Sequence, residues 1–153
     1  MSIKEEEILV SERNFDSIVS YTAGVTRSQF LTELRDNKKI VGTKCHDCDM
    51  VWVPARSTCV KCFGSLREFV EVRNVGIVKT YSVINIFRDF YPIKPPFILG
   101  IIQLEGADTG LVHFINEIDP KDVKIGMRVE TVFKEERIGS ILDIKYFRPL
   151  KYV

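Results

Sequence analysis

Four cysteines in two Cys-x-x-Cys pairs are the residues of this sequence best suited to chemistry. They are Cys45 and Cys48, then Cys59 and Cys62, and the chain has no other cysteine. Each pair holds two thiolates close enough to bind one ion, and two pairs complete a tetrahedral shell. We therefore predict a metal site with all four cysteines as ligands. Zinc is the expected metal, and mononuclear iron of the rubredoxin type is the alternative.

The predicted metal is structural rather than catalytic. Four protein ligands close the coordination shell, whereas a catalytic metal keeps one position open. Disulfides are the competing interpretation, but they need an oxidising compartment, and Met1 is followed by Ser-Ile-Lys-Glu-Glu-Glu rather than by an apolar signal segment. A metal also replaces the hydrophobic core that so short a segment cannot build alone. We expect a structural metal in a cytoplasmic protein.

Outside the cysteines, the sequence offers no recognisable catalytic constellation. The two histidines, His46 and His113, have no evident nucleophile or acid–base partner in the sequence, and no glycine-rich phosphate loop occurs. We therefore predict that the protein is not an enzyme. Its net charge of +1 creates no field that would draw it to nucleic acid or membrane, and no apolar run approaches the ~20 residues of a membrane span.

Two amphipathic segments before the first cysteine pair are predicted to form helices. The first covers residues 12–21, and the second runs from Thr26 to about Asn37, where Thr26 and Gln29 form a capping box. The apolar stripes are Phe15, Ile18 and Val19 in the first and Phe30, Leu31 and Leu34 in the second. Such faces serve equally well to cover the rest of the molecule or to dock a partner protein.

The rest of the chain alternates β-prone stretches with turn signals. Five strands are expected, at residues 68–87, 97–105, 110–116, 128–134 and 141–147. The first is interrupted at Arg73 to Gly76, which predicts a bulge or sharp bend. One helical turn is expected to open at Asp119, between the third and fourth strands. This order of elements is typical of an OB-fold, a five-stranded Greek-key barrel.

The predicted architecture is mainly β and has three parts. An N-terminal helical arm spans residues 1–38, a rubredoxin-like zinc ribbon 39–66 and a five-stranded OB-fold barrel 67–153. OB-folds bind ligands on strands two and three and on the loops after strands one and four. Here those loops are predicted at 88–96, which is aromatic and proline-rich, and at 135–139. The apolar strands suit an apolar ligand or a protein better than a polynucleotide.

Several motifs, in this order, resemble the zinc-ribbon/OB-fold family of acyl-CoA-associated proteins, long catalogued as a domain of unknown function. Besides the cysteine pairs, they are Phe30 and Leu34, Val41-Gly42, Pro54-Ala55-Arg56, Ile125-Gly126-Met127 and Phe147-Arg148-Pro149. One departure concerns the residue after each pair. The family usually has glycine there, whereas this chain has Asp49 and Phe63.

The resemblance implies a non-catalytic acyl-CoA-binding or scaffolding subunit of a thiolase-type, acyl-CoA condensing complex in lipid or isoprenoid metabolism. The archaeal type accompanies thiolase and hydroxymethylglutaryl-CoA synthase, which we expect to dock on the N-terminal helices. CoA or acyl-CoA is the expected ligand. The candidate cations for its phosphates are Arg56, Lys61, Arg88, Lys94 and Arg148. The alternative is a nucleic-acid-binding zinc-ribbon/OB-fold protein, which the near-neutral charge disfavours.

Overall fold

Helix α1, Gly24–Asn37, is the first element of the computed structural model, which describes residues 20–150. The predicted apolar stripe is confirmed, since Phe30 and Leu34 are buried and Leu31 packs beside them. The predicted capping box is wrong. The helix begins two residues before Thr26, which already lies in the first turn, and no side chain caps it.

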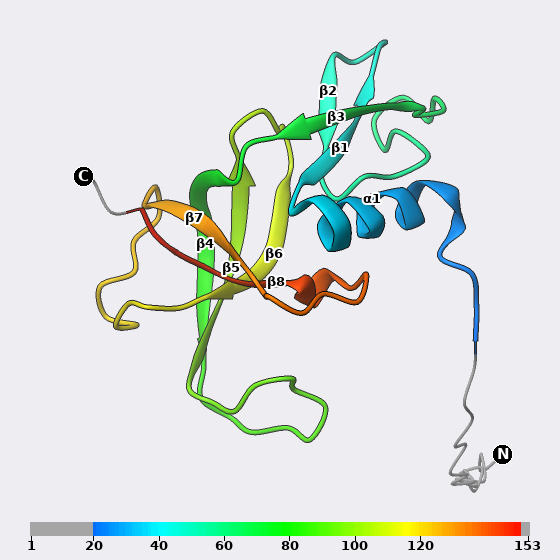
Figure 1. Cartoon of the computed structure of the whole chain (residues 1–153). Coiled ribbons are helices and arrows are strands. Elements are labelled where there is room, and N and C mark those ends of the chain that lie inside the picture. The colour runs from blue at the N-terminus through cyan, green and yellow to red at the C-terminus, as the bar shows by residue number, and fades with distance from the viewer. Residues whose placement is uncertain (1–19, 151–153) are drawn as a thin grey trace, which may run out of the picture.

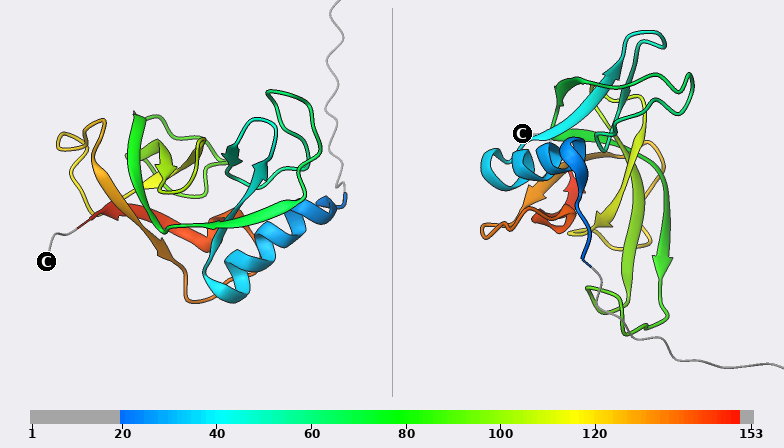
Figure 2. Two further views of the ribbon diagram at one scale, coloured as in Figure 1. Left: turned by 90° about the horizontal axis from the view of Figure 1, so that it is seen from above. Right: turned by 90° about the vertical axis from the view of Figure 1, so that its right-hand side faces the viewer.

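The first predicted helix, at residues 12–21, lies outside the described residues except for its last two. Those two, Ser20 and Tyr21, are not helical. Helix α1 contacts β1 (Ile40–Cys45) and the 3-10 helix η1 (Ile141–Asp143), and it lies beside them in Figures 1 and 2. At 14 residues it is too short to cross a membrane, and no other described helix could do so.

A three-stranded antiparallel sheet carries the cysteines. It consists of β1 (Ile40–Cys45), β2 (Met50–Trp52) and β3 (Glu68–Val72), in the order β2-β1-β3. The predicted bend after residue 72 is confirmed, but the stretch before it does not enter the barrel as expected. Instead, β3 pairs with β1 from Glu68 to Val72. The bend lets the chain leave one sheet and enter the other.

Five further strands close into a barrel, which confirms the predicted OB-fold. They are β4 (Val75–Ile84), β5 (Phe97–Leu104), β6 (Gly110–Ile115), β7 (Arg128–Phe133) and β8 (Ile144–Pro149). Their order is β4-β5-β6-β8-β7, and a parallel pairing of Ile115 with Phe147 closes the barrel. Strand β5 alternates as a half-buried strand should, with Ile102 and Leu104 inside and Ile101 outside.

One connection matches the prediction and one differs from it. The single turn expected at Asp119 is present: the Asp122 N–H donates to the Asp119 carbonyl, and Asp119 Oδ1 accepts a hydrogen bond from the Lys121 N–H. The predicted fifth strand begins late, because Ile141–Asp143 form the 3-10 helix η1. There Ser140 and Asp143 make a reciprocal capping box, which favours a turn over an extended strand.

The ribbon sheet and the barrel share one hydrophobic core. Buried residues of α1, β1 and β3, such as Leu34, Ile40 and Val72, belong to the same cluster as the barrel interior. A second, small cluster lies at the cysteines and contains Cys45, Cys59 and Leu66, with Trp52 packed against it. The division into parts at 1–38, 39–66 and 67–153 stays a prediction.

Candidate functional site

The two Cys-x-x-Cys pairs lie in two tight turns that face each other. Cys45 ends β1 and Cys48 lies in the turn before β2, whereas Cys59 and Cys62 lie in the connection from β2 to β3. The second turn is closed by a hydrogen bond from the Phe63 N–H to the Cys59 carbonyl and by one from the Cys59 N–H to the Gly64 carbonyl. A short antiparallel bridge between Thr58 and Ser65 flanks it.

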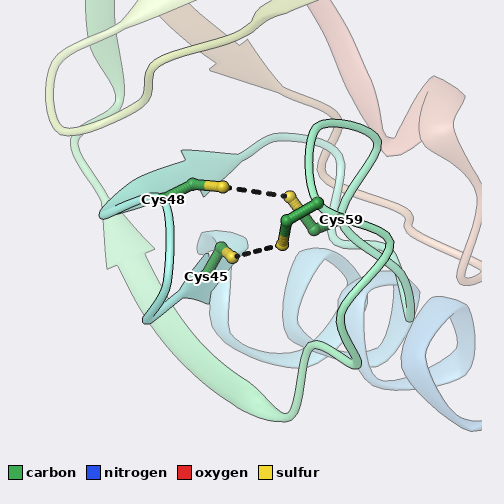
Figure 3. A group of neighbouring side chains, drawn as sticks. Cys45, Cys48 and Cys59 are labelled. Atoms are coloured by element: carbon green, nitrogen blue, oxygen red, sulfur yellow. Dashed lines mark hydrogen bonds between the residues drawn. The ribbon is translucent and has the colours of Figure 1, made fainter.

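These turns bring four sulfur atoms together. The Sγ atoms of Cys45 and Cys62 lie 3.6 Å apart, those of Cys48 and Cys59 4.0 Å apart, and all four lie within 4.8 Å of one another. Figure 3 shows Cys45, Cys48 and Cys59 pointing toward a common centre. A tetrahedral ion about 2.3 Å from each sulfur would space them roughly 3.8 Å apart. The four-cysteine cluster can therefore hold a metal ion.

The surroundings of the cluster shift the pKa values of two of its thiols in opposite directions. Burial of the Cys59 thiol opposes its ionisation, but hydrogen bonds from the N–H groups of Cys62 and Lys61, together with those from the Cys45 and Cys62 thiols, lower the pKa of Cys59 to about 6. Burial, together with the neighbouring cysteines, raises the pKa of Cys48 to about 12. A bound dication would favour the thiolate form of every ligand. Its charge would thus offset the repulsion among the sulfurs.

The residue after each pair adopts a left-handed conformation. Asp49 has φ of 51° and Phe63 has φ of 60°. These are the two positions where the sequence departs from the glycine usual in the family it resembles. Glycine adopts this region without steric cost, aspartate tolerates it, and a bulky residue is strained there. The turns thus keep their geometry without glycine.

His113 is buried inside the barrel and is not part of the four-cysteine cluster. Its Nε2–H donates to the Ile141 carbonyl at 3.2 Å, which ties β6 to the 3-10 helix η1. Burial lowers the pKa of His113 to about 4, so the ring is neutral at pH 7. Its ring packs edge-on against the rings of Phe114 and Phe147.

The five cations predicted to bind CoA phosphates are not brought together. Arg56 and Lys61 lie on the β2–β3 connection, where the Arg56 guanidinium lies 5.0 Å from the centre of the Trp52 ring. Arg88 and Lys94 lie on the β4–β5 loop. The ribbon and this loop are at opposite ends of the molecule (Figures 1 and 2).

The fifth candidate, Arg148 on β8, is already paired. Its Nε donates to Glu130 at 2.7 Å, and its guanidinium lies 3.7 Å from Glu117. The sequence could not indicate this pairing, because Glu130 is on β7, whose register against β8 is set by barrel closure. A phosphate would have to compete with two carboxylates for Arg148.

A pocket of about 500 Å³ opens where β5 begins and β6 ends. The aromatic β4–β5 loop, predicted as the first ligand loop, forms one wall through residues such as Ile93 and Lys94. The second predicted loop, 135–139, is absent from the lining, but its neighbours Lys134 and Leu142 are present. Lys134 and Lys145 are the two lining cations that the sequence analysis missed. Only their proximity to a strand end could have drawn attention to them.

Comparison with known sequences finds related archaeal proteins. The family described as "ChsH2, C-terminal OB-fold domain" matches residues 69–134. A DUF35 domain-containing scaffold protein of Methanocaldococcus jannaschii is 32% identical over 124 residues, which cover 77% of this chain and 86% of that protein. A scaffold protein of the same description from Methanothermobacter thermautotrophicus is 33% identical over 100 residues, which cover 64% of this chain and 74% of that protein.

Comparison with solved structures finds the same fold. The crystal structure of a DUF35-family protein of unknown function from Sulfolobus solfataricus superposes with a TM-score of 0.55 and 28% identity, over 68% of this chain and 75% of that one. A chain of the Ltp2-ChsH2(DUF35) aldolase superposes with a TM-score of 0.63 over 85% of this chain and 98% of that one. Its identity of 21% supports the fold alone.

Proposed function

The chain belongs to the DUF35 family, and from this premise we propose that it is a non-catalytic scaffold subunit of a partner enzyme. The proposed partner is a thiolase-type, acyl-CoA condensing enzyme of lipid or isoprenoid metabolism, with hydroxymethylglutaryl-CoA synthase as a second partner. CoA or acyl-CoA is the proposed ligand, and the cytoplasm is the proposed location. The observation that carries the scaffold role is the 32% identity, over 86% of its length, to a protein named as a DUF35 scaffold.

The proposed metal of the four-cysteine cluster is a structural zinc. All four ligands come from the protein, so the shell would be closed and no position would remain for a substrate. Cysteines of the cluster also belong to the small second hydrophobic core, where Cys59 packs with Leu66. Zinc would therefore hold the two turns together and keep the ribbon surface in one shape.

The start of α1 is the proposed docking surface for the partner enzyme. Tyr21, which precedes the helix, is 81% exposed and Val25 in its first turn is 85% exposed, whereas Phe30 and Leu34 of α1 are buried in the core. Exposed apolar side chains next to a firmly packed helix are typical of an interaction site. The buried half of α1, with Phe30 and Leu34, would hold the surface in place. The exposed start of the helix would contact the partner.

The experiment is co-expression of the tagged full chain with the thiolase of the same organism, followed by size-exclusion chromatography. We expect one stable complex, and we expect the double variant Tyr21→Asp/Val25→Asp to lose it. The matched control is Ile125→Asp/Ile138→Asp, which alters two similarly exposed apolar residues on barrel loops. A deletion of residues 1–38 would be a poorer test, because it also removes buried Phe30 and Leu34.

Each outcome separates one part of the proposal. No complex with the unaltered chain would contradict a thiolase partner. Loss of the complex in the control variant alone would move the docking surface from α1 to the barrel loops. Salt-sensitive binding of single-stranded DNA or RNA by the isolated chain would instead favour the nucleic-acid alternative.

A further inference from the structure

The pocket at the barrel end combines apolar walls with a cationic lining. Ile98 and Ile115 come from β5 and β6, Ile118 from the connection after β6 and Leu142 from η1, while Ile93 comes from the β4–β5 loop. A mostly apolar pocket of a few hundred cubic ångströms with few polar groups is the usual form of a small-molecule site. An apolar part of a ligand would cover this apolar surface.

Three lysines from three separate segments line the same pocket. Lys94 comes from the β4–β5 loop, Lys134 from the connection directly after β7 and Lys145 from β8. In the described part of the chain, the lysines that make ion pairs are others, namely Lys38, Lys39 and Lys44. The lining lysines therefore keep their charges uncompensated by a carboxylate. A pocket lined by one sign of charge attracts a ligand of the opposite sign.

We propose that this pocket binds an amphiphilic anion, an aliphatic chain of medium length that bears a carboxylate or a phosphate. The chain would lie on Ile93, Ile118 and Leu142, and the anionic group would contact Lys134 and Lys145. Two ligands share this aliphatic chain: a free carboxylic acid, whose own carboxylate carries the charge, and an acyl-CoA, whose thioester is neutral and whose phosphates carry the charge. In its acyl-CoA form the inference rests on the proposed function, whereas in its free-acid form it does not.

Calorimetry on the zinc-loaded full chain can test the site with four probes: butyrate, decanoate, CoA and decanoyl-CoA. Decanoate should bind at least about tenfold more tightly than butyrate, because its longer chain buries more apolar surface in the pocket. Its binding should show a negative heat-capacity change, which marks apolar burial. Decanoyl-CoA should likewise bind more tightly than CoA.

Variants assign the binding to this pocket. Lys134→Ala/Lys145→Ala should weaken decanoate about tenfold, because two charge-assisted contacts are lost. The matched control, Lys79→Ala/Lys124→Ala, removes two exposed lysines outside the pocket and should change nothing. Ile93→Asp, on an exposed loop, should abolish binding by placing a negative charge in the lining.

The outcomes distinguish the pocket from the CoA role. Equal affinity for butyrate and decanoate, or equal weakening in the pocket and control variants, would overturn the proposed pocket. Decanoate binding without CoA or decanoyl-CoA binding would support the pocket and count against the CoA role. CoA binding that is unchanged by the decanoyl chain and by Ile93→Asp would support the CoA role and overturn the pocket.

Discussion

The cysteine cluster and the barrel-end pocket are assembled in opposite ways. All four sulfur atoms of the cluster come from residues 45–62, and two tight turns are enough to bring them within 4.8 Å. The pocket takes its lining from residues 92–146, including three strands and three connections. The cluster is a local site, whereas the pocket exists only when the barrel is closed.

The two sites also differ in how their charges are balanced. The sulfurs lie against one another, and a metal ion is the natural counter-charge for such a group. The lysines around the pocket have no carboxylate partner within the described residues, although Arg148 nearby on β8 is held by Glu130. This contrast supports the two proposals, a structural metal at the cluster and an anionic ligand in the pocket.

The largest expected effect is loss of the metal. Cys48→Ser should abolish stoichiometric zinc, because binding at such sites is worth about 10–16 kcal/mol and is coupled to local folding. Hydrogen exchange should then rise around Cys59 and Leu66 but stay slow in β4 to β8, because those strands belong to the other core cluster. Elemental analysis measures the metal. Equal loss of protection in ribbon and barrel would show that the two regions fold as one unit.

A smaller effect is expected from the loop beside the pocket. The buried Asp143 carboxylate accepts hydrogen bonds from the N–H groups of Ile138, Gly139 and Ser140 at 2.7–3.1 Å. Asp143→Ala leaves these donors unsatisfied and should cost about 3 kcal/mol of unfolding free energy. Urea unfolding measures this cost. Unchanged zinc content in this variant would confirm that the two regions are separable, and zinc loss would contradict it.

The pH dependence of stability should come partly from the barrel interior. The pKa of His113 is about 4 in the folded protein, below its ordinary value of 6.5. Below pH 6.5 the unfolded chain therefore binds a proton that the folded chain does not. Stability from this residue is complete above pH 6.5 and falls by about 3 kcal/mol as the pH drops to 4.

His113→Gln is the matched control for this pH effect, since glutamine retains a hydrogen-bond donor but does not titrate. Urea unfolding at pH 7, 6, 5 and 4 should give a shallower loss of stability for the variant than for the unaltered chain. Parallel curves would mean that groups elsewhere dominate the acid unfolding.

The smallest expected effect is a gain of stability at the second cysteine turn. Phe63 has a left-handed backbone conformation, and its side chain is 78% exposed. Packing of this side chain therefore offsets little of the backbone strain. Phe63→Gly should remove a cost of about 1–2 kcal/mol, and the greater freedom of the unfolded chain reduces the net gain to about 1 kcal/mol. Thermal unfolding of the zinc-loaded protein measures the gain. Asp49→Gly is the comparison, and it should gain less because it loses the 2.9 Å ion pair with Lys44.

Much of the fold could be predicted from local patterns. The apolar stripe of α1, the bend after β3 and the strands predicted at 97–105 and 110–116 follow from residue spacing and turn chemistry. The capping box at Thr26 was wrong because the helix begins earlier, at Gly24. The strand expected at Ile141 is a 3-10 turn, because Asp143 reaches back to three backbone donors, a contact that strand periodicity does not reveal.

The sequence by itself determined the cysteine set and the succession of barrel strands along the chain, because both depend on residues close together in sequence. Only the tertiary structure decided which cations are free. Barrel closure pairs Arg148 with Glu130 across β7 and β8, and it brings Lys94, Lys134 and Lys145 to one pocket from segments up to 51 residues apart (145 − 94). The physical reason is that strand register, rather than sequence spacing, sets which side chains meet across a closed sheet.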